Sequence, residues 1–179
     1  MSTQNFRSLF VDGPTANLPT ITAITETVLI PTIFTPIPAM AARSSASFKL
    51  TVGGTCTTGL AGTLTITPRY GLVIGGTSLT ASAAQNYVPS ITLAPFLYEC
   101  YVYFRNLGVA AGANSNVICT GRWTSLGAIA TASSMTSVHH TSTGSVPVDT
   151  TVASGLWIGA TFSVAPSVIP LWSNWEQIG

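Results

Sequence analysis

Residues 96–105 read Phe-Leu-Tyr-Glu-Cys-Tyr-Val-Tyr-Phe-Arg, and their side chains alternate in character from one residue to the next. A period of two predicts a β-strand, because successive side chains of a strand point to opposite faces of the sheet. We expect this strand to span residues 96–107. One face is apolar and carries Phe96, Tyr98, Cys100, Val102 and Phe104. The other face carries Leu97, Glu99, Tyr101, Tyr103 and Arg105.

A second alternating stretch predicts a hairpin partner for this strand. Residues 116–125 read Asn-Val-Ile-Cys-Thr-Gly-Arg-Trp-Thr-Ser and follow a loop rich in Gly, Ala and Asn. An antiparallel register with Glu99 opposite Arg122 makes one face of the hairpin wholly apolar, so we assign that face to the core. The same register pairs Tyr98 with Trp123, Val102 with Cys119, and Phe104 with Val117.

The opposite face of the hairpin gathers charged and aromatic side chains. We expect it to point outward and treat it as a candidate interface with other subunits. Its members are Glu99, Tyr101, Tyr103, Arg105 and Arg122.

The rest of the chain repeats the pattern of short strands between Gly, Pro, Asn and Ser clusters. Good helix formers are scarce and β-branched residues abound. Three prolines within residues 31–40 predict an edge segment or crossing loop, and residues 126–144 predict a long loop with at most one short strand. Further strands are expected at 21–30, 45–52 (ended by Gly53-Gly54), 62–70, 87–93, 145–152, 156–163 and 168–178.

This strand count predicts an all-β fold, an antiparallel β-sandwich of jelly-roll type. We expect a single domain over residues 21–179. Residues 1–20 show no periodic pattern and contain Pro14 and Pro19, so we expect an extended N-terminal arm that a neighbouring subunit orders.

The scarcity of charge suits a protein that is covered by other subunits. Only 6% of the residues are charged and the formal net charge is +1, whereas soluble domains average roughly 25% charged residues. Charge keeps free monomers apart, so its absence favours assembly; a monomer solvated by hydroxyl side chains is the alternative. With six Lys and Arg in all, the chain has too few cations to package a genome, and we expect no direct contact with nucleic acid.

The cysteines predict that the chain folds in a cytoplasm, and the hydropathy pattern predicts that it does not cross a membrane. Cys56, Cys100 and Cys119 are odd in number and lack metal-ligand spacing, so we expect buried, reduced thiols. Residues 1–20 lack the features of an export signal. Residues 155–172 are uncharged, but their prolines and alternation predict two buried strands rather than a membrane helix.

A series of motifs follows in order along roughly residues 45–179. They are Gly-Thr-Leu-Thr-Ile-Thr-Pro-Arg-Tyr-Gly (62–71), the aromatic strand 96–105, Thr-Gly-Arg-Trp (120–123), Val-Asp-Thr-Thr-Val (148–152), a strand that contains tryptophan, and Trp-Glu-Gln (175–177). In this order the chain is similar to small β-sandwich structural proteins of tailed bacteriophages, such as head decoration, head-fibre and minor tail proteins. The resemblance implies a virion component that assembles in the host cytoplasm as a homo-oligomer, commonly a trimer, on other virion proteins such as the major capsid protein. It carries over no catalytic residue and no cofactor.

Sites for catalysis or metals find little support, and we predict a protein without enzymatic activity. His139-His140 is expected in an exposed loop, and adjacent residues on a strand would in any case point to opposite faces. No Gly-x-Ser-x-Gly nucleophile motif occurs. Glu26, Glu99 and Glu176 are expected at the surface or in ion pairs, and Asp149 in a local hydrogen bond to the backbone.

Two alternative functions stay open. The first is a receptor- or glycan-binding module of a phage fibre or tail, in which Trp172 and Trp175 stack on sugars; core or interface positions would explain the same residues. The second is the principal shell protein of a small jelly-roll virus.

Overall fold

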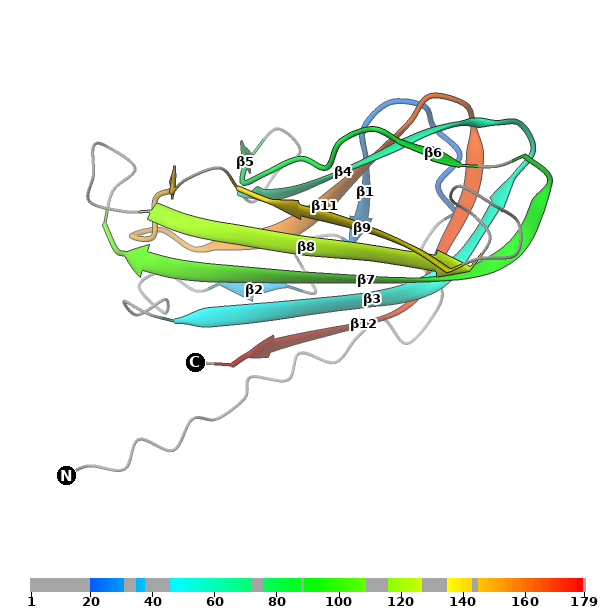
Figure 1. Cartoon of the computed structure of the whole chain (residues 1–179). Helices are drawn as coiled ribbons and strands as arrows, with labels where there is room; N and C mark the ends of the chain where they lie inside the picture. The colour runs from blue at the N-terminus through cyan, green and yellow to red at the C-terminus, as the bar shows by residue number, and fades with distance from the viewer. Residues whose placement is uncertain are drawn as a thin grey trace.

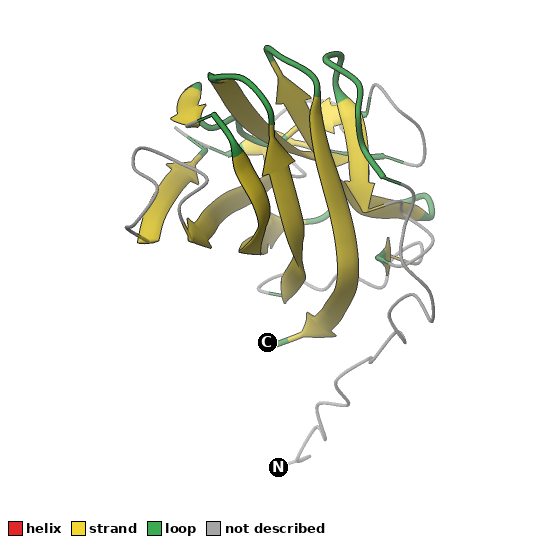
Figure 2. Ribbon diagram, turned by 90° about the vertical axis from the view of Figure 1, so that its right-hand side faces the viewer, coloured by secondary structure: helices red, strands yellow, loops and turns green. Residues whose placement is uncertain are grey.

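The computed structural model describes residues 20–30, 35–37, 46–71, 76–87, 89–108, 116–126, 135–142 and 145–178. Over these residues the protein is all-β: two antiparallel sheets pack face to face as a β-sandwich, and Figure 2 contains no helix. No described helix is long and apolar enough to cross a membrane. Of the predicted N-terminal arm only Thr20 is described, so the arm lies outside the described residues.

The two sheets are called the β7 sheet and the β11 sheet, each after one of its inner strands (Figure 1). The β7 sheet has the order β10-β8-β7-β3-β12, and β9 also pairs with β8. Its strands are β3 (Ser47–Thr58), β7 (Ile91–Asn106), β8 (Asn116–Leu126), β9 (Met135–Thr141), β10 (Val146–Pro147) and β12 (Pro166–Gln177).

The β11 sheet has the order β1-β11-β4-β5, with β2 pairing with β11 and β6 with β4. Its strands are β1 (Thr27–Ile30), β2 (Pro36–Ile37), β4 (Gly62–Tyr70), β5 (Thr77–Ser78), β6 (Gln85–Tyr87) and β11 (Ser154–Phe162).

The predicted hairpin register is confirmed. β7 and β8 pair antiparallel with Glu99 opposite Arg122, and the three apolar pairs align as expected. The side chains that this register assigns to the core are buried, and Phe96 stacks on Trp123 with ring centroids 4.2 Å apart. The alternation of this one hairpin therefore fixes which face of the β7 sheet meets the second sheet.

Several predicted boundaries were wrong. β3 does not stop at Gly53-Gly54 but continues to Thr58, because both glycines make room for close neighbours: Trp172 lies over Gly53, and the Phe96 ring lies against Gly54. Where a strand was predicted at 145–152, the structure has only the two-residue strand β10. The one short strand that the prediction allowed within residues 126–144 is present as the seven-residue strand β9.

The core between the sheets is aromatic and contains the cysteines. Phe48 stacks on Trp175 with centroids 5.1 Å apart. Cys56, Cys100 and Cys119 are buried and form no disulfide, in agreement with the prediction. Burial raises the pKa of the Cys56 thiol to about 11, so this thiol is protonated and inert at neutral pH.

Candidate functional site

The outer face of the β7 sheet carries a cluster of charges centred on Glu99. Glu99 forms an ion pair with Arg122 on β8, and its Oε1 lies 3.2 Å from Lys49 Nζ on β3. Its side chain is 14% exposed although it lies on the outer face. The hydrogen bond from Arg122, and then that from Lys49, lowers the pKa of Glu99 against the opposing effect of burial. The carboxylate is therefore ionised and already neutralised within the subunit.

Two tyrosines extend this cluster along β7. Tyr101 and Tyr103 stack nearly parallel, with centroids 6.4 Å apart, and Lys49 Nζ lies 5.5 Å from the Tyr101 centroid. Tyr103 is 40% exposed. The face thus offers flat aromatic surface beside charges that are satisfied internally.

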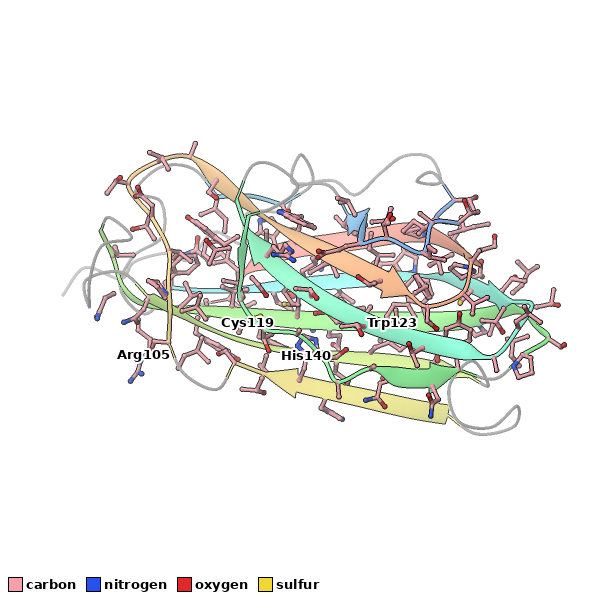
Figure 3. The ribbon with its side chains drawn as sticks, turned by 90° about the horizontal axis from the view of Figure 1, so that it is seen from above. Arg105, Cys119, Trp123 and His140 are labelled. Carbon is pink, nitrogen blue, oxygen red and sulfur yellow. The ribbon has the colours of Figure 1, made fainter. Side chains whose placement is uncertain are left out.

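Arg105 lies at the end of the hairpin, two residues beyond Tyr103 on β7. It lies at the irregularity that ends the β7–β8 pairing, is exposed, and its Nη1 lies 3.3 Å from Ser145 Oγ. Figure 3 shows it at the far end of the hairpin from Trp123. The structure therefore brings together four of the five predicted interface residues, and it adds Lys49.

The two tryptophans proposed for sugar stacking differ in their surroundings. Trp175 is 1% exposed and belongs to the core, so its ring is not available to a ligand. Trp172 is 47% exposed on the outer face of the β7 sheet. A strand places residues three apart on opposite faces, which separates the two rings.

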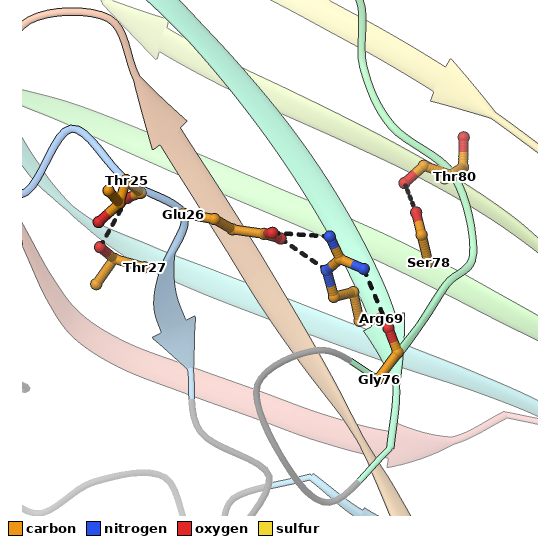
Figure 4. Close-up of polar contacts among 7 residues, drawn as sticks. All are labelled: Thr25, Glu26, Thr27, Arg69, Gly76, Ser78 and Thr80. Carbon is orange, nitrogen blue, oxygen red and sulfur yellow. Dashed lines mark hydrogen bonds and ion pairs between the residues drawn. The ribbon is translucent and has the colours of Figure 1, made fainter.

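A second polar cluster lies on the outer face of the β11 sheet (Figure 4). Arg69 on β4 donates two hydrogen bonds to Glu26, at 2.8 and 2.7 Å, and a third to the Gly76 carbonyl at 3.0 Å. Its guanidinium lies 5.4 Å from the Trp157 ring centroid. Glu26 was predicted at the surface or in an ion pair, but no sequence pattern marks its partner Arg69 or the Trp157 ring beneath the guanidinium. One signal in the sequence points to this covered face. In Gly155-Leu156-Trp157-Ile158-Gly159 the core residues Leu156 and Ile158 alternate with glycine and tryptophan, so the outward positions are uncharged as well.

His140 corrects the prediction of an exposed histidine loop. Both histidines lie on β9 and point to opposite faces, as expected for a strand; His139 is exposed and His140 is buried. The His140 ring stacks on Tyr98, with Nε2 3.1 Å from the tyrosine hydroxyl. Burial, aided by the charge of His139, lowers the pKa of His140 from 6.5 to about 4. His140 is therefore a neutral core residue.

The remaining candidates are a metal site, Asp149 and a cavity. Within the described residues, no three His, Cys, Asp or Glu side chains gather as a metal site. Asp149 accepts hydrogen bonds from the Thr151 amide and hydroxyl, which confirms the predicted local contact. A shallow cavity of about 370 Å³ lies between the sheets at one edge. Its lining has no titratable side chain and consists of Leu79, Thr80, Ala81, Thr141, Ser142, Ser145 and Val146.

Comparisons of the chain with protein-family models, curated proteins and solved structures find no match.

Proposed function

We propose that the protein is a structural subunit of a virus particle that decorates or stabilises the head, or forms a head fibre, through contacts between subunits and without catalysis. The observation that carries the proposal is the outer face of the β7 sheet. There Glu99 is neutralised by Lys49 and Arg122 beside the stacked pair Tyr101–Tyr103.

The energetics of this face favour a protein partner. Burying an unpaired charge is costly, and the charges of the Glu99 cluster are already paired within one subunit. Tyr and Arg are enriched at the centres of protein interfaces, where flat aromatic surface is buried. A second copy of the chain or a shell protein therefore meets a smaller desolvation penalty here than unpaired charges would impose.

The strand pairing supports the jelly-roll part of the proposal. The pairs β3–β12, β4–β11 and β7–β8 are nested, as in a long hairpin rolled into a sandwich. In this proposal the predicted arm, residues 1–20, reaches onto a neighbouring subunit or the shell, and the homo-oligomer is a trimer that contacts the major capsid protein.

The oligomeric state tests this proposal most directly. We expect light scattering after size exclusion to show a trimer, and the Tyr103→Asp variant to run as a monomer because it places an unpaired charge in the interface. Leu60→Ser is the control, since Leu60 is exposed in the turn between β3 and β4, away from this face.

Other outcomes would redirect the proposal. A wild-type protein that stays monomeric at all concentrations, or an oligomer that Tyr103→Asp leaves intact, would refute an interface at this face. Electron microscopy separates the roles: binding to particles that lack the protein supports decoration, whereas closed shells formed by the chain alone would favour the principal shell protein.

A further inference from the structure

Trp172 owes its outward direction to a β-bulge in β12. The pairing of β12 with β3 is regular up to Pro170 opposite Gly54 and resumes at Trp172 opposite Gly53, so Leu171 is an extra residue. If the same residues paired regularly without a bulge, Leu171 would face outward opposite Gly53, and Trp172 would face the core opposite Val52. Bulges re-aim side chains in this way and recur beside functional sites.

Gly53 holds the Trp172 indole flat on the sheet. A Cβ atom built on Gly53 would overlap the indole atoms Cε2, Nε1 and Cζ2 at nearly equal distances. A Cβ points away from the sheet, so the ring lies across that direction, directly on the β3 backbone. One face of the indole thus rests on the protein, and the side chain is 47% exposed.

Uncharged polar groups border the ring. The next outward-facing pair along β12 and β3 is Asn174 opposite Thr51, and both residues are half-buried. Two residues along a strand span roughly 6.5 Å, about the width of one sugar ring. On the β7 side, half-buried Leu97 pairs with Gly53. The surface around Trp172 is therefore a flat aromatic ring with an amide and a hydroxyl one sugar width away.

We propose that this surface, the Trp172 platform (Trp172, Gly53, Thr51 and Asn174), binds a neutral pyranose oligosaccharide. The C–H face of one sugar ring stacks on the indole, and its hydroxyls exchange hydrogen bonds with the Asn174 amide and the Thr51 hydroxyl. A pyranose matches both requirements, since it presents an apolar face edged by hydroxyl groups.

The charges on this face argue against other occupants. A nucleic acid would need cations for its phosphates, but the cations of the neighbouring rows, Lys49 and Arg122, are paired with Glu99. An acidic sugar would meet the same lack of available cations. A protein hot spot places its aromatic anchor within a larger packed apolar patch, whereas the next outward-facing pair along β12 and β3, Asn174 and Thr51, is polar.

The chain offers a clean optical test, because Trp123, Trp157 and Trp175 are all at most 2% exposed and Trp172 alone among the four is open to solvent. Acrylamide quenching of tryptophan fluorescence therefore reports on Trp172. The probes are maltotetraose, cellotetraose and a neutral galactose tetrasaccharide, with a sialylated glycan for comparison. We expect one of the neutral probes to protect Trp172 from acrylamide in a saturable manner.

Variants separate the platform from the rest of the face. By titration calorimetry, Trp172→Ala should weaken binding of the protecting sugar about tenfold or more, and Trp172→Phe should restore part of the affinity. Gly53→Ala should also weaken binding, although it keeps the indole, because the new methyl group lifts the ring off the sheet. Tyr103→Ala, an exposed aromatic elsewhere on the same face, is the control and should bind as the wild type does.

Three results would overturn the proposal: no neutral probe protects Trp172, protection survives Gly53→Ala unchanged, or acrylamide fails to reach Trp172 in the protein without sugar. The last result would place Trp172 in a contact between copies. The proposal does not depend on the oligomer, so a monomeric protein that binds the sugar would refute the subunit interface and leave this site intact.

Discussion

The outer faces of the two sheets carry the same kinds of residue in opposite states. Each has an Arg–Glu ion pair and a tryptophan near a glycine. On the β11 sheet, Trp157 is 2% exposed beneath Arg69, and Glu26 closes over Gly159. On the β7 sheet, Trp172 is 47% exposed on Gly53 and the Arg122 side chain is 48% exposed. The tryptophan of the β11 sheet is therefore buried by groups of the same subunit, whereas the tryptophan of the β7 sheet is open to solvent.

The difference comes from the segment that precedes β1. It brings Glu26 across the outer face of β11, where glycine at position 159 allows the carboxylate to approach the strand. The paired groups on the β11 sheet fasten the chain to itself. This contrast teaches that composition alone does not distinguish an interface from an internal contact; what distinguishes them is whether the aromatic and charged groups are buried within the subunit.

The largest expected effect is a contrast between the two tryptophans. Trp157→Ala should destabilise the protein by about 3–5 kcal/mol, because a buried indole leaves a cavity. Trp172→Ala should cost less than about 1 kcal/mol, as is usual for exposed positions. Urea unfolding followed by far-ultraviolet circular dichroism measures both. Equal losses would show that the two faces are covered to the same degree.

Acid should lower the stability of the protein mainly through His140, which lies on the inner face of the β7 sheet. Burial lowers the pKa of His140 from 6.5 to about 4, so below pH 6.5 the unfolded chain takes up a proton that the folded chain refuses. Stability should therefore fall between pH 6.5 and pH 4, by about 3 kcal/mol at the lower end. Unfolding curves across this range measure the loss.

His140→Phe should remove this loss, because phenylalanine keeps an aromatic ring against Tyr98 but does not titrate. His139→Gln, at the exposed neighbouring position, is the matched control and should retain most of the decline. The lowered pKa of Glu99 acts at still lower pH: its contribution is complete above the ordinary carboxyl pKa of 4.5 and is lost as pH falls below that value. A flat profile between pH 6.5 and pH 4 in the wild type would contradict the burial of His140.

Disrupting the Arg69–Glu26 ion pair on the β11 sheet should have an intermediate effect on stability. Gly159→Ala places a methyl group where the Glu26 carboxylate lies, and it should cost about 1–3 kcal/mol by breaking the hydrogen bonds of a charged pair. Gly53→Ala is the matched change on the open face and should cost less than about 0.5 kcal/mol, because the displaced indole is exposed and alanine suits a strand better than glycine. Thermal unfolding of the two variants compares them.

The smallest effect belongs to Arg122. Arg122→Ala should destabilise the isolated subunit by at most about 1 kcal/mol, and added salt should shrink the difference, because exposed ion pairs contribute little and are screened. Arg69→Ala should cost more at every salt concentration, because the Arg69 side chain is 21% exposed and that of Arg122 is 48% exposed. Unfolding in low and high sodium chloride tests both, and a larger loss for Arg122→Ala would reverse the assignment of closed and open faces.

The sequence was most informative where the side chains alternate without interruption. The opposite charges of Glu99 and Arg122 were enough to set the β7–β8 register, and with it the core face and most of the candidate interface. Alternation failed where a residue is inserted: Leu171 shifts the phase of β12, and nothing in the sequence marks that bulge except the neighbouring Pro170.

Other features depend on partners distant in sequence. Gly53-Gly54 is typical of a turn, yet β3 passes through it because Trp172 and Phe96 occupy the space that side chains would fill. His140 lies in a segment whose composition is typical of loops, and only the pairing of β9 with β8 sets its ring against Tyr98. The link between Arg69 and Glu26 joins residues 43 positions apart, which no local pattern reveals.

The pairing of β3 with β12 has a consequence for how the chain is made. β3 begins at Ser47, but its partner β12 ends only at Gln177. β4 and its partner β11 are also far apart in the sequence. A ribosome therefore releases β3, β7 and β8, which pair with one another, before β11 and β12 emerge to complete the two sheets. Contacts of such long range slow folding, so the growing chain carries half-sheets with exposed inner faces until its last strands are synthesised. Chaperones that hold apolar strands have their longest opportunity to bind in that interval.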